Sequence, residues 1–167
     1  MKFAIALASI LVLAQGSMPS RAQDPAAPTQ YINFATAQKM ITAALKTATK
    51  ANVQVGISIV DANGDLVYAV RMDGASDMGV ISSRGKARAA LLFGLPTKQV
   101  HDLLVAGHSV EAKLTAPPNG AIELAIQQGG LPIIRDGKVI GGIGVGGSPS
   151  AEDERIAQSG IDSLASK

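Results

Sequence analysis

Two dipeptides, Asn63-Gly64 and Asp136-Gly137, restrict the fold of this chain more than any other feature of its sequence. Each separates two runs in which apolar residues alternate with other residues. The tight turn between antiparallel strands needs positive φ angles at both of its central positions. Asn-Gly and Asp-Gly dipeptides favour this turn because their residues adopt such angles. The four strands predicted in this way cover residues 53–59, 66–72, 131–135 and 138–145.

Apolar spacing at helical period and capping residues predict four helices around these hairpins. The helices cover about 34–51, 77–93, 96–106 and 150–164, and residues 121–127 are a candidate fifth strand. Hairpins require antiparallel pairing, so the sequence indicates an α+β protein rather than a doubly wound parallel sheet. The predicted architecture is a central antiparallel sheet with helices packed on it.

The first residues have the layout of a secretory signal peptide. Lys2 precedes an uncharged, mostly apolar run from residue 3 to residue 14, and Ser20 and Ala22 precede a plausible cleavage point. The run is shorter than the roughly 20 residues of a membrane span, which disfavours an uncleaved anchor. We therefore predict a signal peptide at 1–22, a linker at 23–33 and one domain at 34–167, in a protein that is secreted or periplasmic.

Composition excludes several classes of function. Without Lys2 and Arg21 the 15 cations of the chain become 13, against 13 acidic residues, so the mature protein shows no basic excess for nucleic acid. Aromatic residues make up 3% of the chain and Trp is absent, which disfavours a stacking platform for single strands. Cys is absent too, which excludes disulfides, thiolate zinc sites and cysteine nucleophiles.

The segment GKVIGGIGVGG, residues 137–147, contains the spacing G-x-G-x-x-G at Gly142, Gly144 and Gly147. A dinucleotide-binding loop needs a strand that ends at the first glycine and a helix that begins within the motif. Here the apolar alternation runs through the glycines, and the next helix begins only beyond Pro149. The motif is therefore not expected to bind a dinucleotide.

Alternation instead places Ile140, Gly142, Gly144 and Gly146 on one face of a strand. Glycine within a strand usually marks a place where something approaches the backbone closely. A helix of the same domain, a neighbouring subunit and a flat ligand are the alternatives for this face.

Four blocks of the sequence resemble the GlcG/HbpS family of small haem-binding proteins, to which the C-terminal domain of PduO is related. The blocks are VQVGISIVDANGDLVYAVRMDGA, KARAALLF followed by PT, GGLPIIRDGKVIGGIGVGG and DERIAQSG. The resemblance implies a profilin-like domain with an antiparallel sheet of about five strands, haem as cofactor and assembly into a homo-oligomer. One departure is Gly146, where the family usually has Ser.

Under this resemblance His101 and His108 are the candidate axial ligands, since haem iron is commonly held by His. His101 falls in a short predicted helix, whereas His108 follows Gly107, which is expected to end the helical register. A joint metal site of the two is therefore not expected. The alternative for each is an ordinary histidine at the surface or the edge of the core.

Arg71, Asp73 and Lys86 lie in the two blocks that match best and are further candidates for binding a cofactor, together with Gly142, Gly144 and Gly146. Arg and Lys would pair with haem propionates or a small acid through charged hydrogen bonds. The alternative is a solvated ion pair among these charged residues.

No hydrolytic motif is present, neither G-x-S-x-G nor H-E-x-x-H. The sequence therefore favours an exported protein that binds haem or a related small molecule for capture, storage or sensing. An enzyme of haem degradation or small-metabolite turnover, and an oligomeric accessory subunit that binds nothing, are the alternatives.

Overall fold

The computed structural model describes residues 31–113 and 123–165. Four helices and four strands follow one another along these residues. They are α1 (Phe34–Lys50), β1 (Gly56–Asp61), β2 (Leu66–Arg71), α2 (Asp77–Phe93), α3 (Thr97–Val105), β3 (Gly130–Arg135), β4 (Lys138–Gly146) and α4 (Ser150–Asp162). All four predicted helices and both predicted hairpins are confirmed.

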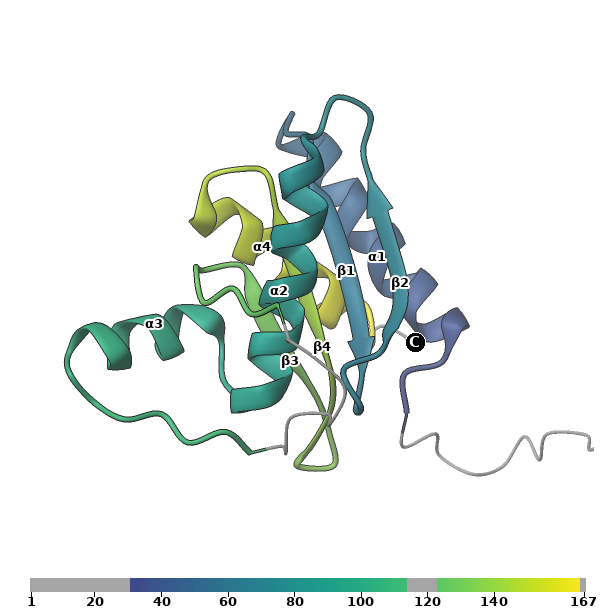
Figure 1. Ribbon diagram of the computed structural model, residues 1–167. Coiled ribbons are helices and arrows are strands. Elements are labelled where there is room, and N and C mark those ends of the chain that lie inside the picture. Colours follow the sequence, from purple (N-terminus) through teal and green to yellow (C-terminus); the bar gives the residue numbers. More distant parts are fainter. Residues whose placement is uncertain (1–30, 114–122, 166–167) are drawn as a thin grey trace, which may run out of the picture.

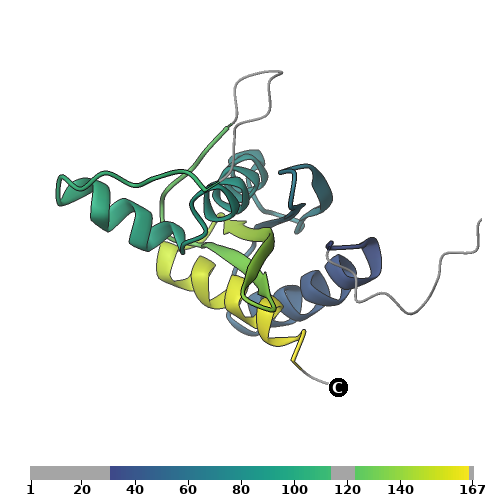
Figure 2. The same ribbon diagram turned by 90° about the horizontal axis from the view of Figure 1, so that it is seen from below.

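The strands form one antiparallel sheet in the order β2-β1-β4-β3. Helices α1 and α4 lie side by side on one face of the sheet and α2 covers the other, while α3 extends away from the body (Figure 1). The view from below shows the three layers and the projecting α3 (Figure 2). The α+β class is therefore confirmed. Within the described residues, no helix is long and apolar enough to cross a bilayer.

The predicted fifth strand is wrong for residues 123–127, and residues 121 and 122 lie outside the described ranges. Glu123 pairs with Arg84 on α2. A Cβ added at Gly85 of the same helix would lie 3.0 Å from the Cβ of Ala125. The segment thus lies against α2, and the sheet of the described residues has four strands.

The two hairpin turns differ from each other. Asp136 and Gly137 have φ angles of 50° and 73°, as the turn residues predicted. In the first hairpin only Gly64 has a positive φ, 81°, so the expectation for Asn63 is wrong. There the Asp61 carboxylate accepts hydrogen bonds from the backbone N–H groups of Asn63 and Asp65. A side chain, rather than a two-residue turn, therefore shapes this connection.

A bulge at Ile140 changes the faces of β4 from the predicted alternation. Ile133 is opposite Gly141 and Ile134 is opposite Val139, so Ile140 is an extra residue on its strand. Its side chain belongs to the main core cluster together with Ile143. Ile140 therefore does not share the face of Gly142, contrary to the strict alternation read from the sequence.

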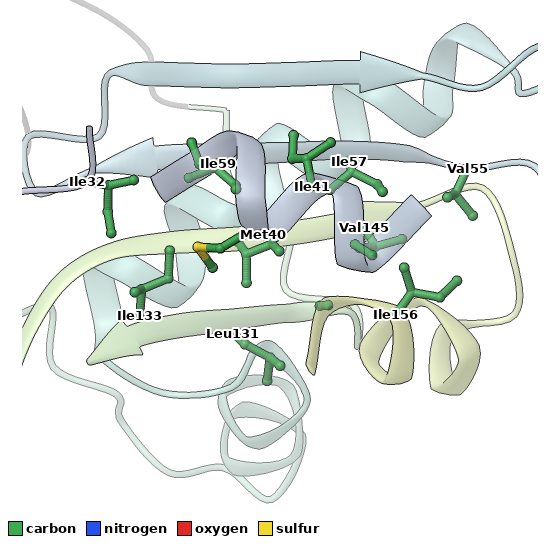
Figure 3. Packing of buried hydrophobic residues seen from close by; sticks show 14 of the residues in the cluster. Ile32, Met40, Ile41, Val55, Ile57, Ile59, Leu131, Ile133, Val145 and Ile156 are labelled. Atoms are coloured by element: carbon green, nitrogen blue, oxygen red, sulfur yellow. The ribbon is translucent and has the colours of Figure 1, made fainter. Parts of the chain in front are cut away.

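The main core lies between the sheet and the pair α1 and α4 (Figure 3). Its members are aliphatic or sulfur-containing side chains that are almost wholly buried. The largest are Met40, Ile41, Ile57, Ile59, Ile133, Ile143 and Ile156. Burial of such side chains stabilises a fold by about 1.5–3 kcal/mol each. Packing of this kind stabilises a chain that has no cysteine.

On the opposite face, α2 lies directly on the glycines of β4. A Cβ added at Gly142 would stand 2.1 Å from the carbonyl oxygen of Ala87, and one at Gly144 would stand 2.0 Å from that of Ser83. A Cβ added at Gly146 would likewise stand too close to the carbonyl oxygen of Gly79. Of the alternatives left open by the sequence, a helix of the same domain occupies this face.

We predict that Gly144→Ala lowers the free energy of unfolding by about 3 kcal/mol or more, because the added methyl group collides with backbone that cannot give way. Urea denaturation followed by circular dichroism measures the change. Gly107→Ala is the matched control: Gly107 has a φ of 80° and nothing within 4 Å of an added Cβ. This control carries backbone strain without a collision and should cost about 1–2 kcal/mol. Equal losses in the two variants would contradict the packing argument.

Candidate functional site

A pocket of about 290 Å³ lies between α3 and the start of α4. Lys98, His101 and Asp102 come from α3, and Ser150 is the first residue of α4. The remaining lining residues, Gln127 and Gln128, precede β3. The pocket therefore combines an imidazole, one ion pair and neutral polar groups from three separate segments.

The loop before β3 is fixed by Thr97, the first residue of α3. The Thr97 hydroxyl donates to the carbonyl oxygen of Gln127 at 2.8 Å and accepts from the N–H of Gly130 at 2.9 Å. Thr97 itself is fully buried. The base of α3 and one wall of the pocket are thus held together by a single buried side chain.

His101 lines this pocket, and 49% of its side chain is exposed. Its Nδ1 lies 3.5 Å from Oδ1 of Asp102, and the other oxygen of that carboxylate accepts a 2.5 Å hydrogen bond from Lys98 Nζ. The hydrogen bond from Lys98 lowers the pKa of Asp102 below its usual value, and the same bond raises the pKa of Lys98. Asp102 is therefore a carboxylate at neutral pH.

Apolar side chains stand next to His101 on the surface of α3. Leu104 and Val105, three and four residues further along the helix, are 43% and 74% exposed. Residues at these spacings share one face of a helix. His101 thus stands beside an exposed apolar surface, on a helix that contacts the body mainly through its first turns.

His108 lies beyond the end of α3, exposed and after Gly107, whose φ is 80°. Its backbone N–H donates to the carbonyl oxygen of Leu103. The helical register does end before His108, as the sequence predicted. No group of three or more His, Cys, Asp or Glu side chains that could hold a metal occurs in the described ranges.

Arg71 and Asp73 lie near the opposite edge of the sheet from His101. Arg71 ends β2, one edge strand, whereas α3 contacts β3, the opposite edge strand. The Arg71 guanidinium donates to the carbonyl oxygen of Ala75 at 2.7 Å and lies 3.4 Å from a carboxylate oxygen of Asp77. Asp73 is exposed. These two candidates therefore do not join His101 in one site.

Lys86 is buried, with 4% of its side chain exposed, and its Nζ donates to Asp153 at 2.8 Å and to the carbonyl oxygen of Val145 at 2.8 Å. The other oxygen of Asp153 accepts from the N–H and the hydroxyl of Ser148. This pair ties α2 to α4 from opposite faces of the sheet. Lys86 therefore has a partner inside the protein and does not reach solvent.

The glycines at the start of β3 leave the room for this ion pair. A Cβ at Gly129 would lie 2.9 Å from Lys86 Nζ and 2.7 Å from the Cβ of Asp153. At Gly130 it would meet the carbonyl oxygen of Lys86 at 2.5 Å. Glycine is needed at both positions because the lysine passes the beginning of β3.

Gly142, Gly144 and Gly146 are all buried under α2. Contact between a bound cofactor and this face would require α2 to move away. The candidate residues thus separate into four places: the pocket with His101, the loop with His108, the β2 end with Arg71 and Asp73, and the interior with Lys86 and the glycines.

Comparison with known proteins identifies the family of this chain. Residues 32–162 match the family described as "Haem degrading protein HbpS-like". The chain belongs to the HbpS-like family. One relative, an uncharacterized 15.0 kDa protein of the dhaT-dhaS intergenic region of Citrobacter freundii, is 34% identical over 78% of this chain and 90% of its own length. Protein GlcG of Escherichia coli K12 is also 34% identical, over 65% of this chain and 76% of its own.

Solved structures agree with this assignment to the HbpS-like family. Protein ORFY of Klebsiella pneumoniae has a TM-score of 0.73 at 30% identity and covers 90% of this chain and 99% of its own. A complex of PduOC with haem has a TM-score of 0.68 at 27% identity, covering 79% and 94%. A double mutant of HbpS from Streptomyces reticuli has a TM-score of 0.67 at 28% identity, covering 94% and 98%.

Sequence reasoning about this HbpS-like chain missed the surroundings of His101 and the partner of Lys86. Lys98 and Asp102 are four residues apart on one helix, a spacing that would have predicted their ion pair. Asp153 lies in the first turn of α4, where an acidic residue by itself indicates only a charge that complements the helix dipole. Its pairing with Lys86, 67 residues away, has no local signal in the sequence.

We predict that Lys86→Met lowers the free energy of unfolding by about 3–5 kcal/mol, because it leaves the Asp153 carboxylate buried without its cation. The double variant Lys86→Met, Asp153→Asn should recover more than half of this loss, since no charge is then buried. Urea denaturation of the single and double variants measures the recovery.

Arg155→Met is the matched control for this pair. Arg155 forms a 2.5 Å contact with Glu152 on the exposed surface of α4, so its loss should leave the urea midpoint unchanged. A Lys86→Met variant as stable as this control would contradict the role assigned to the buried pair.

Proposed function

We propose that this protein binds haem at the exposed face of α3, with His101 as a ligand of the iron. Membership of the HbpS-like family and similarity to a PduOC structure in complex with haem support the proposal. The observation that carries it is the position of His101: a half-exposed imidazole at a pocket, next to exposed apolar side chains.

The residues around His101 fit the chemistry of haem. Imidazole is a common axial ligand of haem iron. Leu104 and Val105 would cover part of the apolar macrocycle, and Lys98 would offer a cation to a propionate. The pocket of about 290 Å³ is at the lower limit of the roughly 300–1,000 Å³ that enclose small ligands, so it would accept one edge of the haem rather than the whole. The iron would supply redox and oxygen chemistry when bound.

Haemin titration of the purified protein tests the proposal. The unmutated protein should give a saturable change in the Soret band. His101→Ala should weaken binding by at least about tenfold, because even residues that only support a metal ligand contribute about 10–100-fold to affinity. His108→Ala is the matched control, since it removes the chain's other histidine from an exposed loop without altering the pocket.

Absence of a saturable Soret change would overturn the proposal. A loss of haem binding in His108→Ala rather than in His101→Ala would transfer the ligand role to His108.

Haem degradation is a second candidate function, favoured by the description of the family. It predicts a time-dependent loss of the bound haem's absorbance after a reductant is added, faster than in a control haemoprotein.

We further propose that the protein acts outside the cytoplasm, in capture, storage or sensing of haem, and that it works as a homo-oligomer. The leader features of residues 1–22 support export. Intact mass of the protein recovered from periplasm or medium should correspond to a chain that begins at Gln23, and light scattering of the same sample should exceed the monomer mass. Recovery of the full-length chain only in the cytoplasm would contradict export.

A further inference from the structure

We infer that Asp102 is a positioning residue for His101: its carboxylate holds the Nδ1–H tautomer of the imidazole and so leaves Nε2 as the atom that binds a ligand. The inference rests on the proposed role of His101 as an iron ligand. It concerns the protein's own residues and can be tested without haem.

The geometry at α3 gives each oxygen of Asp102 a separate partner. Oδ2 accepts from Lys98 Nζ at 2.5 Å, and Oδ1 lies 3.5 Å from Nδ1 of His101. Lys98 and Asp102 are four residues apart, which suits an ion pair along one helix face. Lys98 therefore holds the carboxylate in an orientation that turns its second oxygen towards the imidazole.

Charge then decides which nitrogen of His101 carries the hydrogen. Asp102 forms an ion pair with Lys98, and a carboxylate in an ion pair can only accept hydrogen bonds. A hydrogen bond between Oδ1 and Nδ1 therefore requires the hydrogen on Nδ1, and the neutral ring keeps its lone pair on Nε2. The distance of 3.5 Å is longer than a usual N–H···O bond, about 2.7–3.2 Å, so this hydrogen bond is a weak one.

A further charged group acts on Lys98. Glu154 of α4 adds a second negative charge near Lys98 and raises its pKa, after the larger effects of Asp102. Carboxylates that orient a ligating histidine in this way also raise its basicity and strengthen metal binding.

The test is the tautomer ratio of His101 in the haem-free protein, measured by long-range proton–nitrogen NMR of the imidazole rings. The chain has two histidines, so the His108→Ala variant assigns the signals of His101. Spectra are recorded well above the usual histidine pKa of about 6.5, where the ring is neutral. Asp102→Ala should lower the ratio of Nδ1–H to Nε2–H tautomer by about two- to tenfold, the effect of losing one hydrogen bond.

Two controls accompany this variant. Asp136→Ala removes an exposed carboxylate from the β3–β4 turn and should leave the His101 ratio unchanged. His108 lies beyond the end of α3, and its own ratio in the Asp102→Ala spectrum should also stay constant. A fall confined to His101 and to Asp102→Ala supports the inference, whatever the haemin titration gives.

An unchanged His101 ratio in Asp102→Ala would overturn the inference, even in a protein that binds haem through His101. The haemin titration of the same variant reports on the proposed function separately. If His101 is the ligand, loss of Asp102 should weaken haem binding by about 10–100-fold. No binding to the unmutated protein, together with a shifted tautomer ratio, would reject the proposed function and retain the role of Asp102.

Discussion

The close contact between α2 and the glycine face of β4 is the constraint on which the rest of the structure depends. Carbonyl groups of α2 occupy the space that side chains at Gly142 and Gly144 would fill. With the helix backbone so close, the buried hydroxyls of Ser58 and Ser83 meet at 2.7 Å between sheet and helix. The position of α2 then sets where Lys86 enters the interior and where α3 begins.

The buried pair of Lys86 and Asp153 connects the two sides of the sheet at the start of β3. Gly129 and Gly130 make this connection possible, because any side chain there would collide with the lysine. The same ion pair holds the first turn of α4 beside the loop that Thr97 fixes. Three segments that are distant in the sequence thereby form the pocket around His101.

The candidate site is therefore separate from the core. His101, Lys98 and Asp102 lie on a helix whose outer half contacts little of the body, whereas the most deeply buried charged residues serve the fold. This separation allows α3 to expose apolar side chains and an imidazole without disturbing the packed layers. Substitutions at these three residues should accordingly leave the packed layers intact.

Local features of the sequence determined the helices, the hairpins and the α+β class, because caps, turn residues and apolar periodicity act over a few neighbouring residues. Helix α2 was predicted over residues 77–93, and both bounds are confirmed. The sequence also made His101 a candidate ligand, a prediction that the structure leaves to experiment. Tertiary structure alone decided the partner of Lys86, the helix that fills the glycine face, the path of residues 123–126 and the pocket around His101. Each of these depends on contacts between residues far apart in the chain, for which no short-range pattern exists.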